Sequence, residues 1–110
     1  FVPKIPSYKI ETVAEAIAPS ARIEEIGIRP GEKLHEEMIT ASDSHNTIDI
    51  GPYFAILPAD NKEKYKEFYK GSREVAKGFS YNSGQNDQWV SVDEMRELIK
   101  ENIDPNFKPL

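Results

Sequence analysis

The chain has 110 residues, and its 14 Lys and Arg against 19 Asp and Glu give a formal net charge of −5 with both histidines neutral. This acidic balance, with no stripe of Lys and Arg to offset it, excludes nucleic acid as a partner. A content of 38% hydrophobic and 30% charged residues excludes a disordered acidic tail, and the length is enough for one hydrophobic core but not for two.

The chain opens on Phe1 rather than Met, and the Pro-bracketed stretch Phe1–Pro6 predicts a strand that is already under way. We therefore expect the chain to be a piece of a longer protein. The sequence Thr-Val-Ala-Glu at 12–15 has the spacing of a capping box. It predicts a short helix that runs to about Ala18 and is ended by Pro19.

Three elements are predicted around an Arg-Pro-Gly sequence in the first half of the chain. The β-branched run Ile23–Ile28 predicts a strand, and Arg29–Gly31 predicts the turn that ends it. The helix formers of Glu32–Met38 predict a helix directly after that turn. Polar residues at 43–46 predict a loop.

The second half of the chain alternates strand and helix signals. Two apolar runs joined by Gly51 and Pro52 predict a hairpin or bent strand pair, and Ser-Val-Asp-Glu at 91–94 predicts a capped helix. The predicted strands are Ile48–Ile50, Tyr53–Leu57 and Phe79–Tyr81, and the predicted helices are Asn61–Lys70 and the one that opens at Ser91. Tyr65, Phe68 and Tyr69 recur at helical spacing, and we expect them to pack on a core. With no repeat and no low-complexity linker, residues 1–110 are predicted to form one α+β unit.

The predicted turn at Arg29 is the best candidate for chemistry. A helix start after a Pro-Gly turn attracts anions, because its terminal N–H groups lack internal partners. The Arg29 guanidinium can grip a phosphate with two parallel bonds, and the Glu32 carboxylate can accept two hydrogen bonds from a vicinal diol such as a ribose. The alternative is that Arg29 and Glu32 form a surface ion pair beside a turn.

Three sequence blocks add a resemblance to a known family. Phe-Val-Pro-Lys-Ile-Pro-Ser at 1–7, Gly-Ile-Arg-Pro-Gly-Glu-Lys-Leu-His-Glu-Glu-Met-Ile at 27–39, and Phe-x-Tyr-x-Ser-x-x-Asn at 79–86 resemble the carboxy-terminal third of the UDP-N-acetylglucosamine 4,6-dehydratases. These are inverting enzymes of the extended short-chain dehydrogenase/reductase family that open pseudaminic acid synthesis. The resemblance covers essentially the whole chain, although it is loose between residues 43 and 77.

The resemblance implies a role for the chain and for two of its side chains. Residues 1–110 would be a small substrate domain that packs on an NADP-binding Rossmann half, with the UDP-sugar between them. Arg29 would contact the diphosphate of the substrate and Glu32 its uridine ribose. The product would enter polysaccharide or flagellin glycans, and the full-length enzyme is expected to be a homo-oligomer.

The cofactor and proton-transfer residues of that family are missing from the sequence. No Gly-x-Gly-x-x-Gly fingerprint occurs, and none of the five tyrosines has a Lys four residues later. We therefore expect part of the substrate site here, no catalytic residue, and no NADP bound by this stretch alone.

Other motifs give weaker signals. His35 begins a helical zinc motif, but Ile39 stands where the second ligand should be, so no metal site is expected. His35 and its neighbour Glu36 are expected to pack and orient. Trp89 could stack on a uracil or close a core, and Lys4 could lie near the substrate cleft or be solvated.

The remaining composition bounds the protein class. No apolar run reaches the roughly 20 residues that cross a bilayer, no signal peptide opens the chain, and there is no cysteine. We expect a soluble, cytoplasmic protein without a membrane partner. Two other readings stay open: a freestanding non-catalytic module that binds a nucleotide or a protein, and a related UDP-sugar epimerase.

Overall fold

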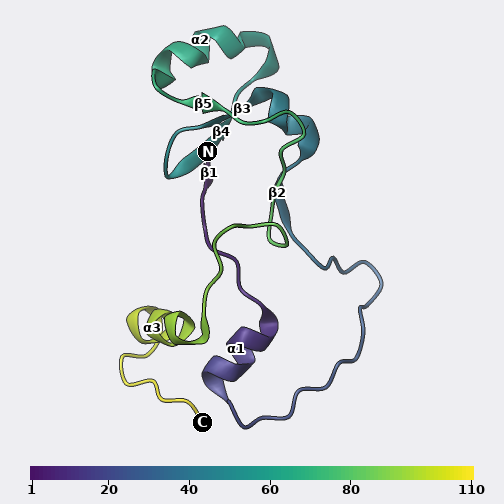
Figure 1. The fold of residues 1–110 in the computed structure, drawn as a ribbon, viewed down its shortest axis with the longest axis vertical. Helices are drawn as coiled ribbons and strands as arrows, with labels where there is room; N and C mark the ends of the chain where they lie inside the picture. The colour runs from purple at the N-terminus through teal and green to yellow at the C-terminus, as the bar shows by residue number, and fades with distance from the viewer. The chain divides into compact units, whose positions relative to one another are not determined.

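The computed structural model describes the backbone of residues 1–110 and every side chain except that of Phe68. The chain is α+β, as predicted, and it divides into two compact units (Figure 1). The sheet unit comprises residues 1–5 and 35–85, and the helix unit comprises residues 6–34 and 86–110. The single core expected from the chain length is wrong, because each unit buries its own apolar cluster. These clusters are Ile48, Ala55 and Leu57 in the sheet unit and Ala16, Val90, Met95 and Ile99 in the helix unit.

The sheet unit is built on four antiparallel strands in the order β1-β4-β3-β5. They are β1 (Val2–Pro3), β4 (Tyr53–Ile56), β3 (Thr47–Asp49) and β5 (Arg73–Glu74). The predicted hairpin is confirmed, because β3 and β4 pair around a turn in which Gly51 has a φ of +93°. Only glycine adopts such an angle without strain. The predicted opening strand is confirmed in shorter form and lies at a sheet edge, where Pro3 needs no partner for an N–H.

The register of the sheet decides which side chains share a face. Ile48 lies opposite Ala55, and both are buried in the core of the sheet unit. The next residue, Asp49, lies opposite Phe54 on one side and Arg73 on the other. Because side chains alternate along a strand, Asp49, Phe54 and Arg73 share the face opposite Ile48 and Ala55.

The rest of the sheet unit is short elements around this sheet. They are β2 (Glu37–Ile39), which pairs with β6 (Tyr81–Asn82), the 3-10 turns η1 (Ala41–Asn46), η2 (Ala59–Asn61) and η3 (Glu67–Tyr69), and the one-turn helix α2 (Lys62–Lys66). The long helix predicted at 61–70 is thus broken into three turns. Tyr69 packs on the core, Tyr65 is half-exposed, and the prediction for Phe68 falls on the side chain outside the described set.

Two elements predicted on either side of the Arg29 turn are wrong. Residues 21–29 form no regular secondary structure, since none of them joins a partner strand. The helix expected over Glu32–Met38 is replaced by an irregular stretch that leads into β2. So short a helix is marginal in water, whereas β2 gains backbone hydrogen bonds with β6.

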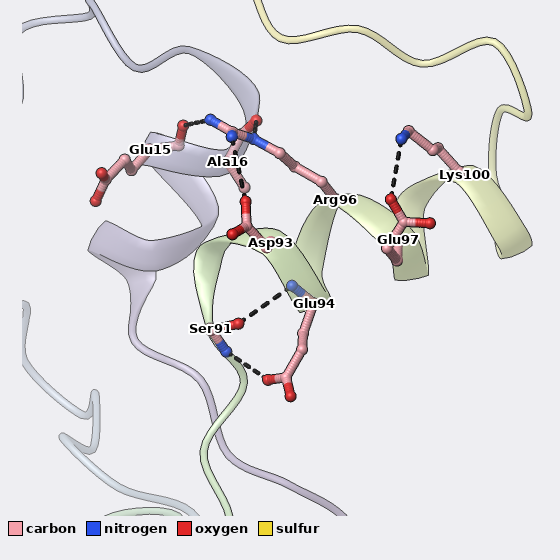
Figure 2. A network of polar contacts seen from close by, with 8 residues as sticks. All are labelled: Glu15, Ala16, Ser91, Asp93, Glu94, Arg96, Glu97 and Lys100. Carbon is pink, nitrogen blue, oxygen red and sulfur yellow. Dashed lines mark hydrogen bonds and ion pairs between the residues drawn. The ribbon is translucent and has the colours of Figure 1, made fainter.

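The helix unit consists of α1 (Ile10–Ile17) packed on α3 (Val92–Asn102). The capping box predicted at Ser91 is confirmed: its hydroxyl accepts a bond from the Glu94 N–H at 3.2 Å, and its own N–H donates to the Glu94 carboxylate at 2.8 Å (Figure 2). The capping box predicted at Thr12 is wrong. The helix begins earlier, with Lys9 as an N-cap that makes no side-chain bond.

Arg96 of α3 completes the end of α1. Its Nε donates to the Ala16 carbonyl at 3.1 Å and its Nη2 to the Glu15 carbonyl at 3.3 Å (Figure 2). The Glu15 carbonyl would normally be paired with the N–H four residues later, but Pro19 has none. Arg96 therefore fills a hydrogen-bonding position that the proline leaves open.

Within the part of the chain that the structure describes, no helix is both long enough and apolar enough to cross a membrane.

Candidate functional site

The Arg-Pro-Gly-Glu sequence folds into a tight turn in the helix unit. The Glu32 N–H donates to the Arg29 carbonyl at 3.1 Å, and Gly31 has a φ of +84°. Proline at the second position and a positive φ at the third are the signature of a type II turn. The predicted turn is confirmed. No helix follows it, so the positive end of a helix dipole is not available to an anion there.

The two predicted site residues are held together by this turn. The Glu32 Oε2 accepts a hydrogen bond from the Arg29 backbone N–H at 2.9 Å, and its Oε1 lies 3.9 Å from the Arg29 Nε. The side chains are 74% and 50% exposed. In this chain Arg29 and Glu32 form a surface ion pair beside a turn, which was the alternative to a substrate site. Their contact with a substrate stays a prediction.

The geometry of this pair leaves its binding groups accessible. At 3.9 Å the Arg29 Nε is beyond hydrogen-bond distance of the carboxylate, and the guanidinium faces solvent. An exposed ion pair of this kind is worth about 0–1 kcal/mol, so an incoming phosphate or diol can replace it at little cost. Glu32 keeps one oxygen on the backbone and can offer the other to a ligand.

Large apolar side chains flank the turn and are left in water. Ile26 is 78% exposed and Leu34 is 82% exposed, and Ile28 is also exposed. Exposed apolar side chains in one stretch of chain are typical of a surface that contacts another molecule or another part of a longer protein.

His35 and Glu36 lie in the sheet unit and are held by the turn after β6. The Glu36 N–H donates to the Ser83 hydroxyl at 3.0 Å, and the Ser83 N–H donates to the Glu36 carbonyl at 2.8 Å. A Cβ on Gly84 would lie 2.6 Å from Cδ2 of the His35 ring, so the glycine provides the space that the ring occupies. His35 is exposed, and the packing role expected of it stays a prediction, while the need for Gly84 was missed by the sequence reasoning.

Trp89 is 42% exposed in the helix unit. Its indole N–H donates to the Asn86 carbonyl at 2.7 Å, which fixes one edge of the ring and leaves much of its surface in solvent. Stacking on a base stays a prediction. Among the described residues, no three His, Cys, Asp or Glu side chains converge on a possible metal position.

Comparison with known proteins connects these residues to a family. Residues 1–58 match the family described as polysaccharide biosynthesis protein. The chain belongs to this family. It is also 44% identical over 105 residues to the UDP-N-acetylglucosamine 4,6-dehydratase (inverting) of Campylobacter jejuni subsp. jejuni serotype O:2, and to the same extent to that of serotype O:23/36. The resemblance to inverting dehydratases indicated by the three sequence blocks is thus confirmed.

A second group of relatives is more distant. The chain is 32% identical over 105 residues to the UDP-glucose 4-epimerase of Rickettsia felis. The alignments cover 90% of this chain, but only 31% of each dehydratase and 30% of the epimerase. The chain therefore spans less than a third of the length of the relatives it matches.

Proposed function

We propose that this chain is the UDP-sugar-binding part of a UDP-N-acetylglucosamine 4,6-dehydratase, a lyase that makes a UDP-4-keto-6-deoxy sugar with inversion at C5. The observation that carries the proposal is the 44% identity over 90% of the chain to two enzymes of that name. Residues 1–110 would form the carboxy-terminal substrate domain of a longer, homo-oligomeric protein.

Within this proposal, the turn at 29–32 supplies binding rather than chemistry. The Arg29 guanidinium takes two oxygens of the substrate diphosphate, and Glu32 accepts hydrogen bonds from the uridine ribose. These groups lie far from the hexose carbons that react, so their binding energy serves to position the sugar. The exposed Ile26 and Leu34 support the proposal, because another part of the protein would cover them.

The proposal places NADP elsewhere in the longer protein. Residues 1–110 contain no Gly-x-Gly-x-x-Gly turn and no Tyr-x-x-x-Lys pair, so the dinucleotide-binding turn and the proton-transfer pair of the family are not among them. When NADP is bound, it supplies the hydride transfer. The part described here binds and orients the nucleotide end of the substrate.

The 32% identity to UDP-glucose 4-epimerases supports a second candidate, an epimerase with the same nucleotide-binding turn. Product analysis separates the two. The protein of the complete reading frame is incubated with NADP and UDP-N-acetylglucosamine, and the mass of the nucleotide-sugar product is measured by mass spectrometry. A product lighter by one water supports the dehydratase. A product of unchanged mass but altered stereochemistry supports the epimerase, and unchanged substrate supports a non-catalytic binding module.

The family description supports a product that enters polysaccharide synthesis. We place pseudaminic acid and flagellin glycans within the same proposal, since inverting dehydratases open that route. The test is to delete the gene and analyse the glycans of the strain. We expect the modified sugar to be missing from them.

A further inference from the structure

The sheet unit contains a hollow that the proposed function does not use. It is an open surface hollow of about 690 Å³, lined by the segment after β1, by β3 and the hairpin turn, by β5, and by the turn between η3 and β5. The lining residues that matter here are Lys4, Asp49, Tyr69, Lys70, Gly71 and Arg73. Ligand pockets commonly enclose about 300–1,000 Å³, so this hollow has room for a molecule the size of a nucleotide.

The sheet register places three of the charged groups together. Asp49 and Arg73 are opposite each other in the pair of β3 with β5. Lys4 follows β1, and its ammonium lies 2.6 Å from the Asp49 Oδ1 and 4.6 Å from the centre of the Phe54 ring. One acidic and two basic side chains thus lie together at the sheet face that carries Asp49 and Phe54.

The charges in the hollow do not balance. Lys4 neutralises Asp49, whereas Lys70 and Arg73 pair with no carboxylate among the side chains that the structure describes. The acid next to Arg73 in the sequence, Glu74, is bound by Lys66 at 2.8 Å and by Lys62 at 3.6 Å. With Lys4, Lys70 and Arg73 against the one carboxylate of Asp49, the lining carries two positive charges in excess, on a chain whose net charge is −5.

The backbone at Gly71 is open. A Cβ added at Gly71, which separates Lys70 from the Ser72–Arg73 stretch, would meet no atom within 4 Å. A ligand can therefore approach the backbone at this turn closely. Tyr69, which packs on the core below, supplies an aromatic wall.

We propose that this hollow binds a phosphate or diphosphate group of a small molecule. The planar guanidinium of Arg73 takes two oxygens in parallel, and the Lys70 ammonium takes a third. The Lys4–Asp49 pair forms the polar wall beside them. All residues of this site belong to the sheet unit, and the proposal does not depend on the proposed function.

Nuclear magnetic resonance titration of the 110-residue chain with pyrophosphate, at constant ionic strength, tests the proposal. The amide signals of Gly71, Ser72 and Arg73 are expected to shift and saturate. The double variant Lys70→Gln/Arg73→Gln is expected to weaken binding at least tenfold, because it removes charge-assisted bonds. Both positions are exposed, and amide dispersion in the variant spectrum verifies that it is folded. Arg73→Lys, which keeps the charge but loses the fork, is expected to give an intermediate loss.

Lys64→Gln/Lys77→Gln is the matched control, because it also removes two positive charges from the sheet unit, at exposed positions outside the hollow. It should change the affinity less than twofold. An equal loss in the control, or shifts spread over lysines of both units, would mean general charge attraction and would overturn the proposal.

Two further ligands identify the source of the phosphate. UDP that shifts the same amides and competes with pyrophosphate supports a site for the phosphates of a nucleotide. Binding of pyrophosphate without UDP supports a site for a free inorganic anion. Uridine that binds equally well without any phosphate would overturn the proposal. The readout here is the set of amide shifts at Gly71–Arg73, whereas the proposed function is judged by the mass of the product made by the complete protein, so failure here and failure of the proposed function are distinguishable.

Discussion

The ammonium of Lys4 lies 2.6 Å from the carboxylate of Asp49, although the two residues are 45 positions apart in the sequence. Asp49 ends β3, and its other hydrogen bond comes from the Gly51 N–H at 3.0 Å, inside the hairpin turn. This one carboxylate therefore joins the segment after β1 to the turn of the β3–β4 hairpin.

This relationship predicts an acid sensitivity of the sheet unit. The hydrogen bond from Lys4 is the main cause that holds the pKa of Asp49 below its usual value, and the Gly51 N–H and the charge of Arg73 act in the same direction. The pKa of Asp49 is lower in the folded state than in the unfolded state. The pair therefore contributes its full stability at pH values above the unfolded pKa of about 4, and this contribution is lost as the pH falls through the folded pKa. Asp49→Asn should flatten this dependence.

Denaturant unfolding of both proteins between about pH 2 and pH 6 measures the effect, which should be on the order of 1 kcal/mol or less because the pair is partly exposed. Asp60→Asn is the control, since it lies in the same unit outside this contact. If the free energy of unfolding falls equally in wild type and in Asp49→Asn as the pH is lowered, the Lys4–Asp49 pair does not cause the acid sensitivity and the prediction is wrong.

The Ser91 cap predicts a difference between two superficially similar sites. Ser91→Ala removes the hydroxyl that accepts the Glu94 N–H and should cost about 0.5–2 kcal/mol of unfolding free energy. Thr12→Ala, at the capping box that the fold does not use, should stay within about 0.5 kcal/mol. Circular dichroism during urea unfolding compares the two. Equal costs would show that the Ser91 hydroxyl is not the stabilising group.

The space at Gly84 predicts an interaction between two substitutions. Gly84→Ala would place a methyl group 2.6 Å from the His35 ring, so the ring must move, at a cost of about 1 kcal/mol or more. In a chain that already carries His35→Ala, the same substitution should cost much less. The double-mutant cycle from urea unfolding gives the difference, and additive effects would mean that the ring and the glycine do not constrain each other.

How much of this could be predicted from the sequence depended on the distance between interacting residues. The turn at Arg29–Glu32 and the cap at Ser91 each involve four consecutive residues, and their local sequence predicted them correctly. The hairpin around Gly51 was predicted for the same reason. The equally local box at Thr12 was wrong, because the helix begins earlier, after Lys9. Arg29 and Glu32 were brought together as predicted because one turn contains both.

Features that depend on distant partners were missed. The strand at Glu37 exists because it pairs with Tyr81 and Asn82, and no pattern within residues 32–38 reports that partner. Ile23–Ile28 has the composition of a strand but has no neighbour to pair with in this chain. The contact of Lys4 with Asp49 and the charge imbalance around Arg73 follow from sheet register, which the sequence does not display.

The affinity of the protein of the complete reading frame for UDP, measured by calorimetry on Arg29 variants, tests the central claim most directly. Arg29→Ala should weaken binding on the order of a hundredfold, since a bidentate charge-assisted contact with the diphosphate is lost. Arg29→Lys should weaken it less, because it keeps the charge without the fork. Arg22→Ala, an exposed arginine of the same unit, is the control and should change the affinity less than twofold. A change below about threefold for Arg29→Ala would contradict the account and leave Arg29 as the partner of Glu32 in a surface ion pair.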